Sequence, residues 1–296
     1  MKIAVTGANG FIGHHTISAL KSIHELLALS RRPAEDMDPR VAYAVTDYSL
    51  ESLRDLFAGR QAIIHLAAQR PHAGKDAVSL GNSLLDCRVF QAAEDCGVAH
   101  VVLISTRGVY GAQPAPWSEQ TPPAPTSLYA LAKLHSEQTA AYFGRRSLCV
   151  TTLRLAQVFG LGEYEASALT TFIRNAYHNK PITLSVTGVR REYVYVKDVV
   201  DAFETTLAQP KSGIYNLGSG EVIGLEEMAQ AFLHAFGRRD GSLTAENPRD
   251  LGEYSLMDSE AFRRDFSWAP SWRFAAAAED IRKMLSDKEV AKRYGL

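Results

Sequence analysis

The sequence predicts an α/β fold, in which a parallel sheet covered on both faces by helices is followed by a smaller mixed α/β lobe. Short, solidly apolar runs alternate with amphipathic stretches through the first half of the chain. That alternation is typical of a parallel sheet that is buried on both faces. The regularity loosens after about residue 159. The 296 residues, 46% of them hydrophobic and 22% charged, suffice for a well-buried core.

The expected elements follow a regular order in the first half of the chain. Apolar runs predict strands at residues 2–6, 26–29, 42–45, 62–66, 100–104 and 149–155, and helical spacing predicts helices at 12–22, 49–57, 78–96 and 127–142. Later we expect helices at 169–179, 225–236 and 274–285 and strands at 193–196 and 214–217. We therefore expect a first domain over residues 1–160. A second lobe is expected over mainly residues 161–296, with a segment near 190–200 that returns to the first domain.

Charge and composition argue against several classes of partner. The 32 basic and 33 acidic residues leave a formal net charge of -1, whereas binding to nucleic acid or an anionic membrane needs a clustered positive field. No apolar run approaches the roughly 20 residues that span a bilayer, and a strand at residue 2 leaves no room for a signal peptide. Cys87, Cys96 and Cys149 form no C-x-x-C pair, and the histidines are scattered. We expect a cytoplasmic protein without a metal.

A glycine-rich turn follows the first strand and opens the first helix. Residues 5–13 read VTGANGFIG and place glycines at positions 7, 10 and 13. Glycine permits a tight turn and a close backbone approach to a pyrophosphate, and the helix N-terminus adds unpaired N–H groups and a favourable dipole. This pattern predicts a doubly wound sheet of the Rossmann type that binds a dinucleotide. The expected contacts are Gly7, Asn9, Gly10, Phe11, Ile12 and Gly13.

The end of the second strand bears on which cofactor binds. NAD-binding sheets commonly carry an acidic residue there, which accepts hydrogen bonds from the adenosine ribose. Here Ser30, Arg31 and Arg32 follow the apolar run instead, and a hydroxyl with two guanidiniums can hold a 2′-phosphate. We therefore favour NADP(H), with Ser30 and Arg31 as contacts, over NAD(H). In the alternative, both arginines are solvated loop charges.

Two further patterns predict proton-transfer chemistry. Tyr129 and Lys133 are four residues apart in an expected helix, so their side chains project from one face. A neighbouring ammonium stabilises a phenolate, which lets the tyrosine exchange a proton near neutral pH. Ser105 and Thr106 follow an apolar strand at the carboxyl edge of the sheet, where ligands bind in open α/β folds. A hydroxyl there can hydrogen-bond a substrate oxygen.

With these residues, almost the whole chain resembles the extended short-chain dehydrogenase/reductases, the family of nucleotide-sugar epimerases, dehydratases and reductases. Residues 6–13 are similar to the family's dinucleotide loop and residues 64–68 (IHLAA) to its fourth-strand signature. Residues 105–111 (STRGVYG) are similar to the segment with the catalytic threonine. The resemblance implies a homodimer, with the helices at 78–96 and 127–142 in its interface.

The resemblance also assigns roles to particular residues. Thr106, Tyr129 and Lys133 match the catalytic positions, and Lys133 is also expected to bind the nicotinamide ribose. Further cofactor contacts are implied for Asp47, Tyr48, Leu66, Ala67 and Ala68. The implied substrate is a nucleotide-diphosphate sugar, which is expected to contact Gln69, Arg70, Thr106, Arg107, Gln157, Arg191 and Arg249.

One departure from the family pattern narrows the reaction. The family's 4,6-dehydratases carry Asp-Glu directly after the catalytic threonine, whereas this chain has Arg107 and Gly108 there. We therefore favour reduction of a 4-keto-6-deoxy sugar nucleotide at C4 by NADPH, in line with Ser30 and Arg31. The alternative is a nucleotide-sugar 4-epimerase of the UDP-glucose or UDP-N-acetylglucosamine type with tightly bound NAD. A non-catalytic NAD(P)-sensing protein is a weaker alternative, because the catalytic residues are all present.

Overall fold

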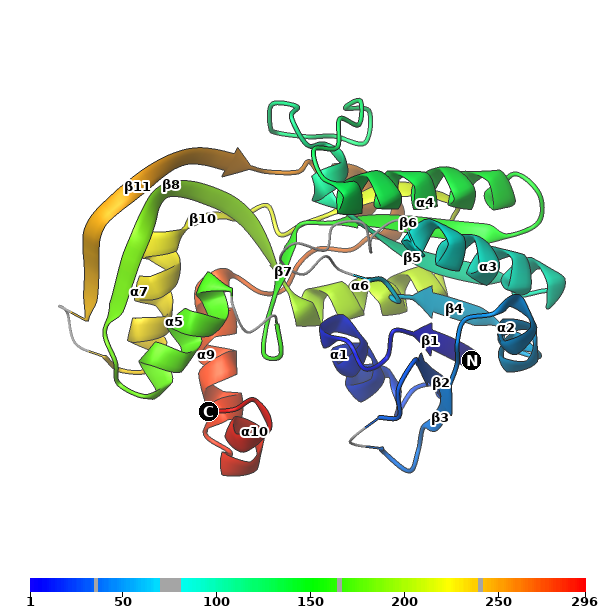
Figure 1. Cartoon of the computed structure of the whole chain (residues 1–296), viewed down its shortest axis with the longest axis horizontal. Coiled ribbons are helices and arrows are strands. Elements are labelled where there is room, and N and C mark those ends of the chain that lie inside the picture. Colours follow the sequence, from blue (N-terminus) through cyan, green and yellow to red (C-terminus); the bar gives the residue numbers. More distant parts are fainter. Residues whose placement is uncertain (35–36, 70–80, 164–166, 239–241) are drawn as a thin grey trace.

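The structure is a computed structural model of the chain, and it describes residues 1–34, 37–69, 81–163, 167–238 and 242–296. Within these residues two sheets lie side by side, each with its own helices (Figure 1). The larger sheet has seven strands in the order β3-β2-β1-β4-β5-β6-β9, and all its pairings are parallel. The predicted Rossmann-type sheet with a smaller mixed lobe is confirmed.

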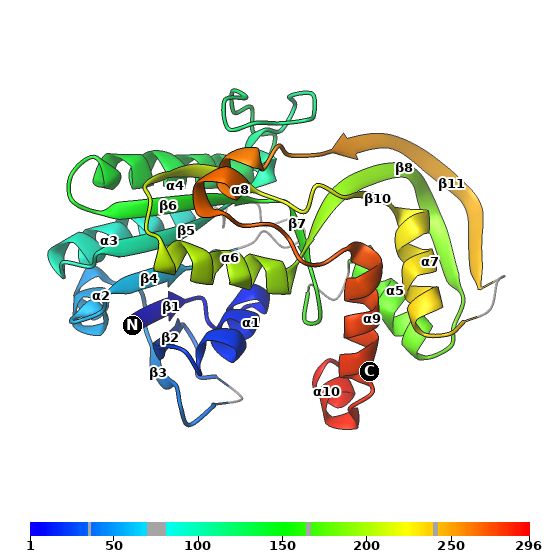
Figure 2. The same cartoon turned by 180° about the vertical axis from the view of Figure 1, so that it is seen from behind.

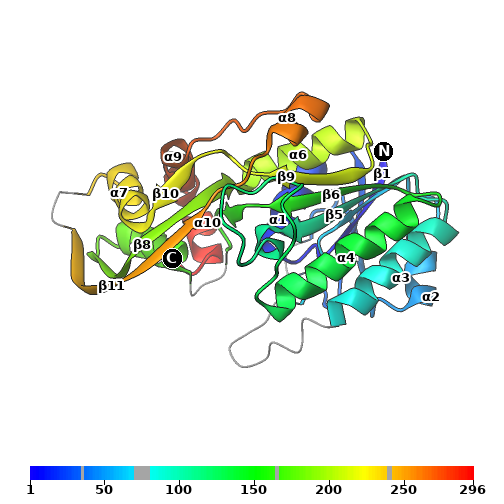
Figure 3. The same cartoon turned by 90° about the horizontal axis from the view of Figure 1, so that it is seen from above.

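The strands of the large sheet and its helices before residue 160 follow the predicted order closely, whereas the helix at residues 196–208 was not predicted. Helices pack on both of its faces, with α3 and α4 on one side and α6 on the other (Figure 3). The first three residues of the helix expected at 78–96 lie outside the described residues. The strands are β1 (Lys2–Thr6), β2 (Glu25–Ser30), β3 (Ala42–Val45), β4 (Ala62–His65), β5 (His100–Thr106), β6 (Cys149–Leu155) and β9 (Gly213–Leu217). The helices are α1 (Phe11–Leu20), α2 (Leu50–Phe57), α3 (Gly81–Asp95), α4 (Leu128–Gly144) and α6 (Val196–Ala208).

Burial of both sheet faces explains why these strands are unbroken apolar runs. In β1, Ile3 and Val5 pack into the core under α1 and α6, whereas Ala4 packs under α2, α3 and α4. In β5, Val102 packs into the first of these cores and Val101 into the second. Successive side chains of a strand point to opposite faces, so a strand covered on both faces needs an apolar residue at nearly every position.

The smaller sheet is built around one long curved strand, β8 (Ile182–Tyr195) (Figure 1 and Figure 2). β11 (Leu243–Ser255) pairs with β8 in parallel, β10 (Val222–Gly224) pairs antiparallel, and β7 (Gln157–Phe159) pairs with the end of β8. The predicted strand at 193–196 corresponds only to this end. Apolar runs do not mark the rest of β8 or β11, because many of their side chains are exposed.

The chain beyond residue 160 contributes to both sheets. α5 (Ala168–Tyr177), α7 (Leu225–Ala235) and α9 (Phe274–Leu285) share the core of the smaller lobe. β9 instead joins the large sheet beside β6, where α8 (Glu260–Phe266) packs on it, and α10 (Lys288–Arg293) lies near the C-terminus. The domain division at residue 160 stays a prediction. None of the helices in the described segments has the length and apolarity to cross a membrane.

Candidate active site

The glycine turn after β1 lies directly against the turn after β4. Gly7 has a φ of +69°, and a Cβ on it would come within 2.7 Å of the Ala67 backbone nitrogen. A Cβ on Gly13 would come within 2.4 Å of the Gly7 carbonyl oxygen, so α1 can start this close to the turn only with glycine at that position. The turn lies between β1 and β4, where the strand order reverses. Ligands of open α/β sheets bind at that point.

The N-terminus of α1 offers hydrogen-bond donors to a ligand. Its N-cap, Gly10, is exposed and provides no side-chain cap. His14 donates to the Gly10 carbonyl, so the amides of Phe11, Ile12 and Gly13 are the ones that a helix N-terminus leaves unpaired within the helix. Such amides, with the helix dipole behind them, suit a pyrophosphate. The residues of this turn therefore fit a dinucleotide cofactor.

Two polar side chains fix the glycine turn in place. Tyr48 is buried, and its hydroxyl accepts a hydrogen bond from the Gly7 N–H at 3.2 Å and donates to the Leu29 carbonyl at 3.3 Å. The Asn9 side-chain amide donates to the Arg32 carbonyl at 3.1 Å. Asn9 and Tyr48 thus tie the turn to the end of β2 and to the segment after it.

The end of β2 carries the residues expected to select the cofactor. The Ser30 hydroxyl donates to the Arg32 carbonyl and so closes its own turn. The side chains of Arg31 and Arg32 are exposed beside it. Asp47 is exposed as well, and hydrogen bonds from Ser49 hold the pKa of its carboxyl below the usual value.

A buried chain of polar side chains runs from the end of β1 toward α4. Thr6 Oγ1 accepts from the backbone N–H groups of Leu66 and Ala67 at 3.1 and 3.2 Å and lies 2.7 Å from His65 Nδ1. Because both lone pairs of this oxygen are used, its proton goes to Nδ1. His65 therefore carries its own proton on Nε2, which donates to Asp86 Oδ1 at 2.8 Å. In this arrangement His65 is neutral and structural.

Tyr129 and Lys133 occupy the first two turns of α4. Ser127 caps the helix by accepting from the Ala130 N–H at 3.2 Å, as expected for a serine before a helix. Tyr129 is partly exposed, whereas Lys133 is 2% exposed. Asp86 on α3 is its buried counter-charge: burial raises the pKa of this carboxyl, but the charge of Lys133 and the hydrogen bond from His65 bring it below the usual value.

Thr106 ends β5, which runs two residues further than predicted, and begins the 3-10 turn η2 (Arg107–Val109). Its Oγ1 accepts from the Gly108 N–H at 3.1 Å. The turn packs against the start of α4, because a Cβ on Gly108 would lie 3.4 Å from the Ala130 side chain. Tyr129 is the neighbour of Ala130 in sequence, so the fold places the turn after Thr106 against the first turn of α4, which carries Tyr129.

A buried ion pair that the sequence analysis missed anchors α4 to the sheet. Arg154 of β6 donates to both carboxylate oxygens of Glu137, at 2.9 and 2.6 Å, and both side chains are buried. Ser105 also donates to this carboxylate, and the Tyr110 hydroxyl accepts from Arg154 at 3.0 Å. Glu137 lies one turn after Lys133. The sequence signal for this ion pair was that Glu137 continues the four-residue spacing of Tyr129 and Lys133 on one helix face.

The predicted substrate residues lie on several elements. Arg191 of β8 forms an ion pair with Glu253 of β11, with Nε 2.7 Å from Oε1. Gln157 begins β7 and pairs in register with Tyr193, two residues after Arg191. Arg249 is exposed and pairs with Val186, five positions before Arg191 on β8. At about 3.3 Å per residue, Arg249 lies about 16 Å from Arg191 along the strand. The fold thus brings Gln157 and Arg191 together but not Arg249.

Gln69 follows β4 and is held through its main chain. Its N–H donates to Asn82 Oδ1 at 2.6 Å, and Asn82 Nδ2 donates to its carbonyl at 2.9 Å. Asn82 is fully buried at the start of α3 and was not predicted. Leu66 and Ala68 are partly buried beside this segment. Arg70 lies outside the described residues.

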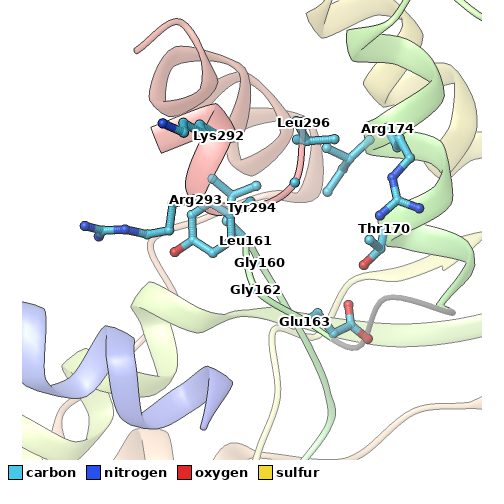
Figure 4. A pocket seen from close by; sticks show the side chains of 12 residues that line it. Gly160, Leu161, Gly162, Glu163, Thr170, Arg174, Lys292, Arg293, Tyr294 and Leu296 are labelled. Atoms are coloured by element: carbon cyan, nitrogen blue, oxygen red, sulfur yellow. The ribbon is translucent and has the colours of Figure 1, made fainter. Parts of the chain in front are cut away.

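A pocket of about 360 Å³ lies between the turn after β7, α5 and the C-terminus (Figure 4). Arg174 and Thr170 of α5 lie on one side of it, with Lys292 and Tyr294 on the other. Its lining contains none of the predicted catalytic residues. Among the described residues there is also no cluster of His, Cys, Asp and Glu side chains that could hold a metal ion.

Comparisons with known proteins agree with this arrangement. Residues 3–218 match the sequence profile of the NAD dependent epimerase/dehydratase family. The chain is 27% identical to a dTDP-glucose 4,6-dehydratase of Streptomyces griseus over 91% of this chain and 89% of that protein. The structure of UDP-N-acetylglucosamine 4-epimerase from Bacillus cereus superposes with a TM-score of 0.88 at 30% identity, over 97% and 96% of the two chains.

A third comparison is with the UDP-glucose 4-epimerase of Thermus thermophilus in complex with NAD. Its structure has a TM-score of 0.81 at 26% identity, over 96% of this chain and 99% of that one. The matched part of the profile includes the glycine turn, the threonine turn and the Tyr129–Lys133 pair. This chain therefore belongs to the NAD dependent epimerase/dehydratase family, as its sequence motifs predict.

Proposed function

We propose that this enzyme moves a hydride between C4 of a nucleotide-linked hexose and a nicotinamide cofactor. The observation that carries the proposal is the meeting of the Thr106 turn, Tyr129 and the buried Lys133 at the carboxyl edge of the sheet that carries the glycine turn. When bound, the nicotinamide supplies hydride transfer to and from the sugar carbon. The glycine turn and the amides at the start of α1 would hold the cofactor.

Each of the three proposed catalytic side chains has a separate role. The Tyr129 phenol exchanges the proton on the C4 oxygen as general acid and base. Lys133, which has the buried carboxylate of Asp86 as a nearby opposite charge, stabilises the phenolate. Thr106 Oγ1 already accepts from Gly108, so its proton remains available to donate to the sugar oxygen and orient it.

These groups serve two reactions, and we place 4-epimerisation first. In that reaction the sugar is oxidised at C4 and reduced again from the opposite face, without net redox change. The similarity over nearly the whole chain to two 4-epimerases, one in complex with NAD, supports this choice. The Ser30 hydroxyl donates its proton to the Arg32 carbonyl within its own turn. It therefore supports a 2′-phosphate site less strongly than the sequence alone suggests.

Reduction of a 4-keto-6-deoxy sugar nucleotide by NADPH is the second candidate. It is supported by the exposed Arg31 and Arg32 and by the lack of an acidic residue directly after β2. Arg191, with Glu253 as its partner in the structure, is the proposed anchor for the substrate diphosphate in either reaction.

The test is whether turnover consumes the cofactor. The protein is mixed with NAD⁺, NADH or NADPH and a panel of nucleotide sugars, including nucleotide 4-keto-6-deoxy sugars and UDP-hexoses, and the reduced-nicotinamide absorbance and the sugar products are followed. Interconversion of C4 epimers without net cofactor consumption is expected. Stoichiometric oxidation of NADPH would instead establish the reductase. Tyr129→Phe should lower turnover in either case by about 10²–10⁴-fold, whereas a cofactor sensor would keep its cofactor binding and show no turnover to lose.

We also propose a homodimer that acts in the cytoplasm. α3 and α4 carry exposed large apolar side chains that a partner copy would cover, namely Leu84, Leu128, Leu131 and Tyr142. The three cysteines are unpaired, which suits a reducing compartment. Residues 1–160 would form the cofactor-binding domain of each subunit.

A further inference from the structure

Arg107 is placed to contact the same sugar as Thr106. It is the next residue in the chain and opens η2. Adjacent Cα atoms are about 3.8 Å apart, and a guanidinium extends further than that from its own backbone. The packing of η2 on the start of α4 keeps this turn beside Tyr129. A sugar whose C4 oxygen is held by Thr106 is therefore within reach of Arg107.

The Arg107 side chain is partly buried, among residues of both charges. Burial lowers the pKa of its guanidinium, and the like charge of Arg191 lowers it further, while Glu253, Tyr193 and Glu192 act in the opposite sense. These causes locate the side chain between η2 and the β8–β11 pair. A guanidinium that loses part of its contact with water is stabilised by a hydrogen-bonding counter-charge.

The nearby carboxylates already have other partners. Both oxygens of Glu253 accept from Arg191. Glu192 is buried, with Oε1 accepting from the Gly220 N–H at 2.7 Å and Oε2 from the Met257 N–H at 2.9 Å. Across the described residues, no hydrogen bond or ion pair engages the Arg107 guanidinium, although this group carries five N–H donors.

We propose that Arg107 binds a carboxylate on the hexose, and that the substrate is a nucleotide uronic acid. This proposal rests on the proposed function, because Thr106 and the C4 oxygen set the position of the sugar. The carboxylate of a uronic acid is carried by C5, the carbon next to C4. A guanidinium fork matches a carboxylate with two parallel hydrogen bonds, whereas a hydroxymethyl or methyl group at the same place offers no charge.

The diphosphate is the other anion of the substrate, and the geometry of a hexose separates the two. The diphosphate is attached through C1, across the ring from C4. Arg191 lies on β8 and is the residue proposed to anchor it, whereas Arg107 adjoins the residue at C4. The carboxylate is therefore the better partner for Arg107.

Binding measurements test this proposal without requiring turnover. Calorimetry with UDP, dTDP, GDP and CDP first identifies the base that binds most tightly. The glucose and glucuronic acid derivatives of that nucleoside diphosphate are then compared. We expect the glucuronic acid derivative to bind about ten- to a hundredfold more tightly, as for a hydrogen bond between charged groups. Arg107→Gln should abolish that ratio and leave the affinity for the nucleoside diphosphate unchanged.

Two further variants make the comparison specific. Arg107→Lys keeps the charge but not the fork, and it should retain part of the ratio. Arg190→Gln is the matched control, because Arg190 is an exposed arginine of β8 that pairs with Glu227 at 3.1 Å. It should change none of the affinities. An unaltered unfolding midpoint would show that each variant is folded.

Three results would overturn the proposal. The wild type could bind both sugars equally, Arg107→Gln could weaken the nucleoside diphosphate alone as much as the sugars, or it could weaken both sugars by the same factor. The second result would assign Arg107 to the diphosphate, and the third to an uncharged sugar oxygen. If only the proposed C4 chemistry is wrong, the preference for the uronic acid persists while no epimerisation or reduction is detected.

Discussion

Charged side chains at buried and partly buried positions of this protein differ in the partners that the fold gives them. Glu137 and Arg154 share two hydrogen bonds with each other. The carboxylate of Asp86 has His65 as a hydrogen-bonding partner and Lys133 as an opposite charge. Arg107, in contrast, has nearby charges but no hydrogen bond to any described residue, and a ligand is therefore expected to complete its surroundings.

His100, at the start of β5, makes stability depend on pH. It is buried, its Nε2 lies 2.8 Å from Thr151 Oγ1, and its Nδ1 has no partner among the described residues. Burial lowers its pKa from 6.5 to about 4. Because the folded-state pKa lies below the unfolded one, the contribution of His100 to stability is complete above pH 6.5 and is lost as the pH falls through 4.

We expect protonation of His100 to reduce the free energy of unfolding by about 3 kcal/mol between pH 6.5 and 4. His100→Gln should lack this loss, since its side-chain amide can still donate to Thr151 and cannot gain a charge. Urea unfolding of both proteins at several pH values measures the difference. Asp198, whose pKa burial raises to about 6, acts in the opposite sense in both proteins, so its effect cancels.

His178→Gln serves as the control, because His178 is exposed. It should leave the pH dependence of unfolding as in the wild type. Parallel stability curves for His100→Gln and the wild type would show that His100 is not the source of the acid sensitivity.

Two interactions fix the position of α4, one at its start and one in its middle. Ser127 fixes the start of the helix, next to Tyr129, and Glu137 joins its middle to β6 through Arg154. Tyr129 and Lys133, the residues proposed to be catalytic, lie between these two points. A helix held on both sides of its functional residues keeps the tyrosine and lysine at a constant place relative to the sheet.

Glu137→Gln should lower the free energy of unfolding by about 3–5 kcal/mol, because it leaves the Arg154 charge buried without a counter-charge. Chemical denaturation measures the change. The control is Asp95→Asn, which removes an ion pair with Arg54 at the surface and should cost at most about 1 kcal/mol. Equal effects of the two substitutions would contradict the role given to the buried pair.

At the scale of the whole molecule, the outer surface formed by α3 and α4 carries large apolar side chains that are exposed to solvent. α3 and α4 pack side by side, and Leu84 and Leu131 on them are 56% and 48% exposed. Exposed apolar side chains grouped on neighbouring helices mark association surfaces. The family resemblance implies the same two helices in the dimer interface.

Leu131→Arg should therefore convert a dimer into a monomer, because it would place a charge in the apolar centre of the interface. Sedimentation velocity of the wild type and the variant measures the change. Leu251→Arg is the control, since Leu251 is exposed on β11 of the other lobe and should leave the dimer intact. A wild type that sediments as a monomer at micromolar concentration would refute the dimer.

Sequence patterns were sufficient where the structural requirement is local. The glycine turn, the Tyr129–Lys133 spacing and the solid apolar strands each lie within a few consecutive residues, and each has one main physical explanation. β8 and β11 were not predicted in full because their pairing with each other, across about sixty positions of chain, compensates for weak local apolar patterning. β9 joined the large sheet for a similar reason, since only the folded chain brings it beside β6.

By itself the sequence determined the fold class, the family and the positions expected to carry the chemistry, because these depend on residue types at short spacing. Only the tertiary structure decided which charges are satisfied. Glu137 and Arg154 lie 17 positions apart, and Asp86 and Ser136 lie 50 apart. Whether a buried charge finds a partner depends on which elements the fold places together, and local sequence does not contain that information. For the same reason, only the structure shows that the Arg107 guanidinium has no hydrogen-bonding partner among the residues it describes.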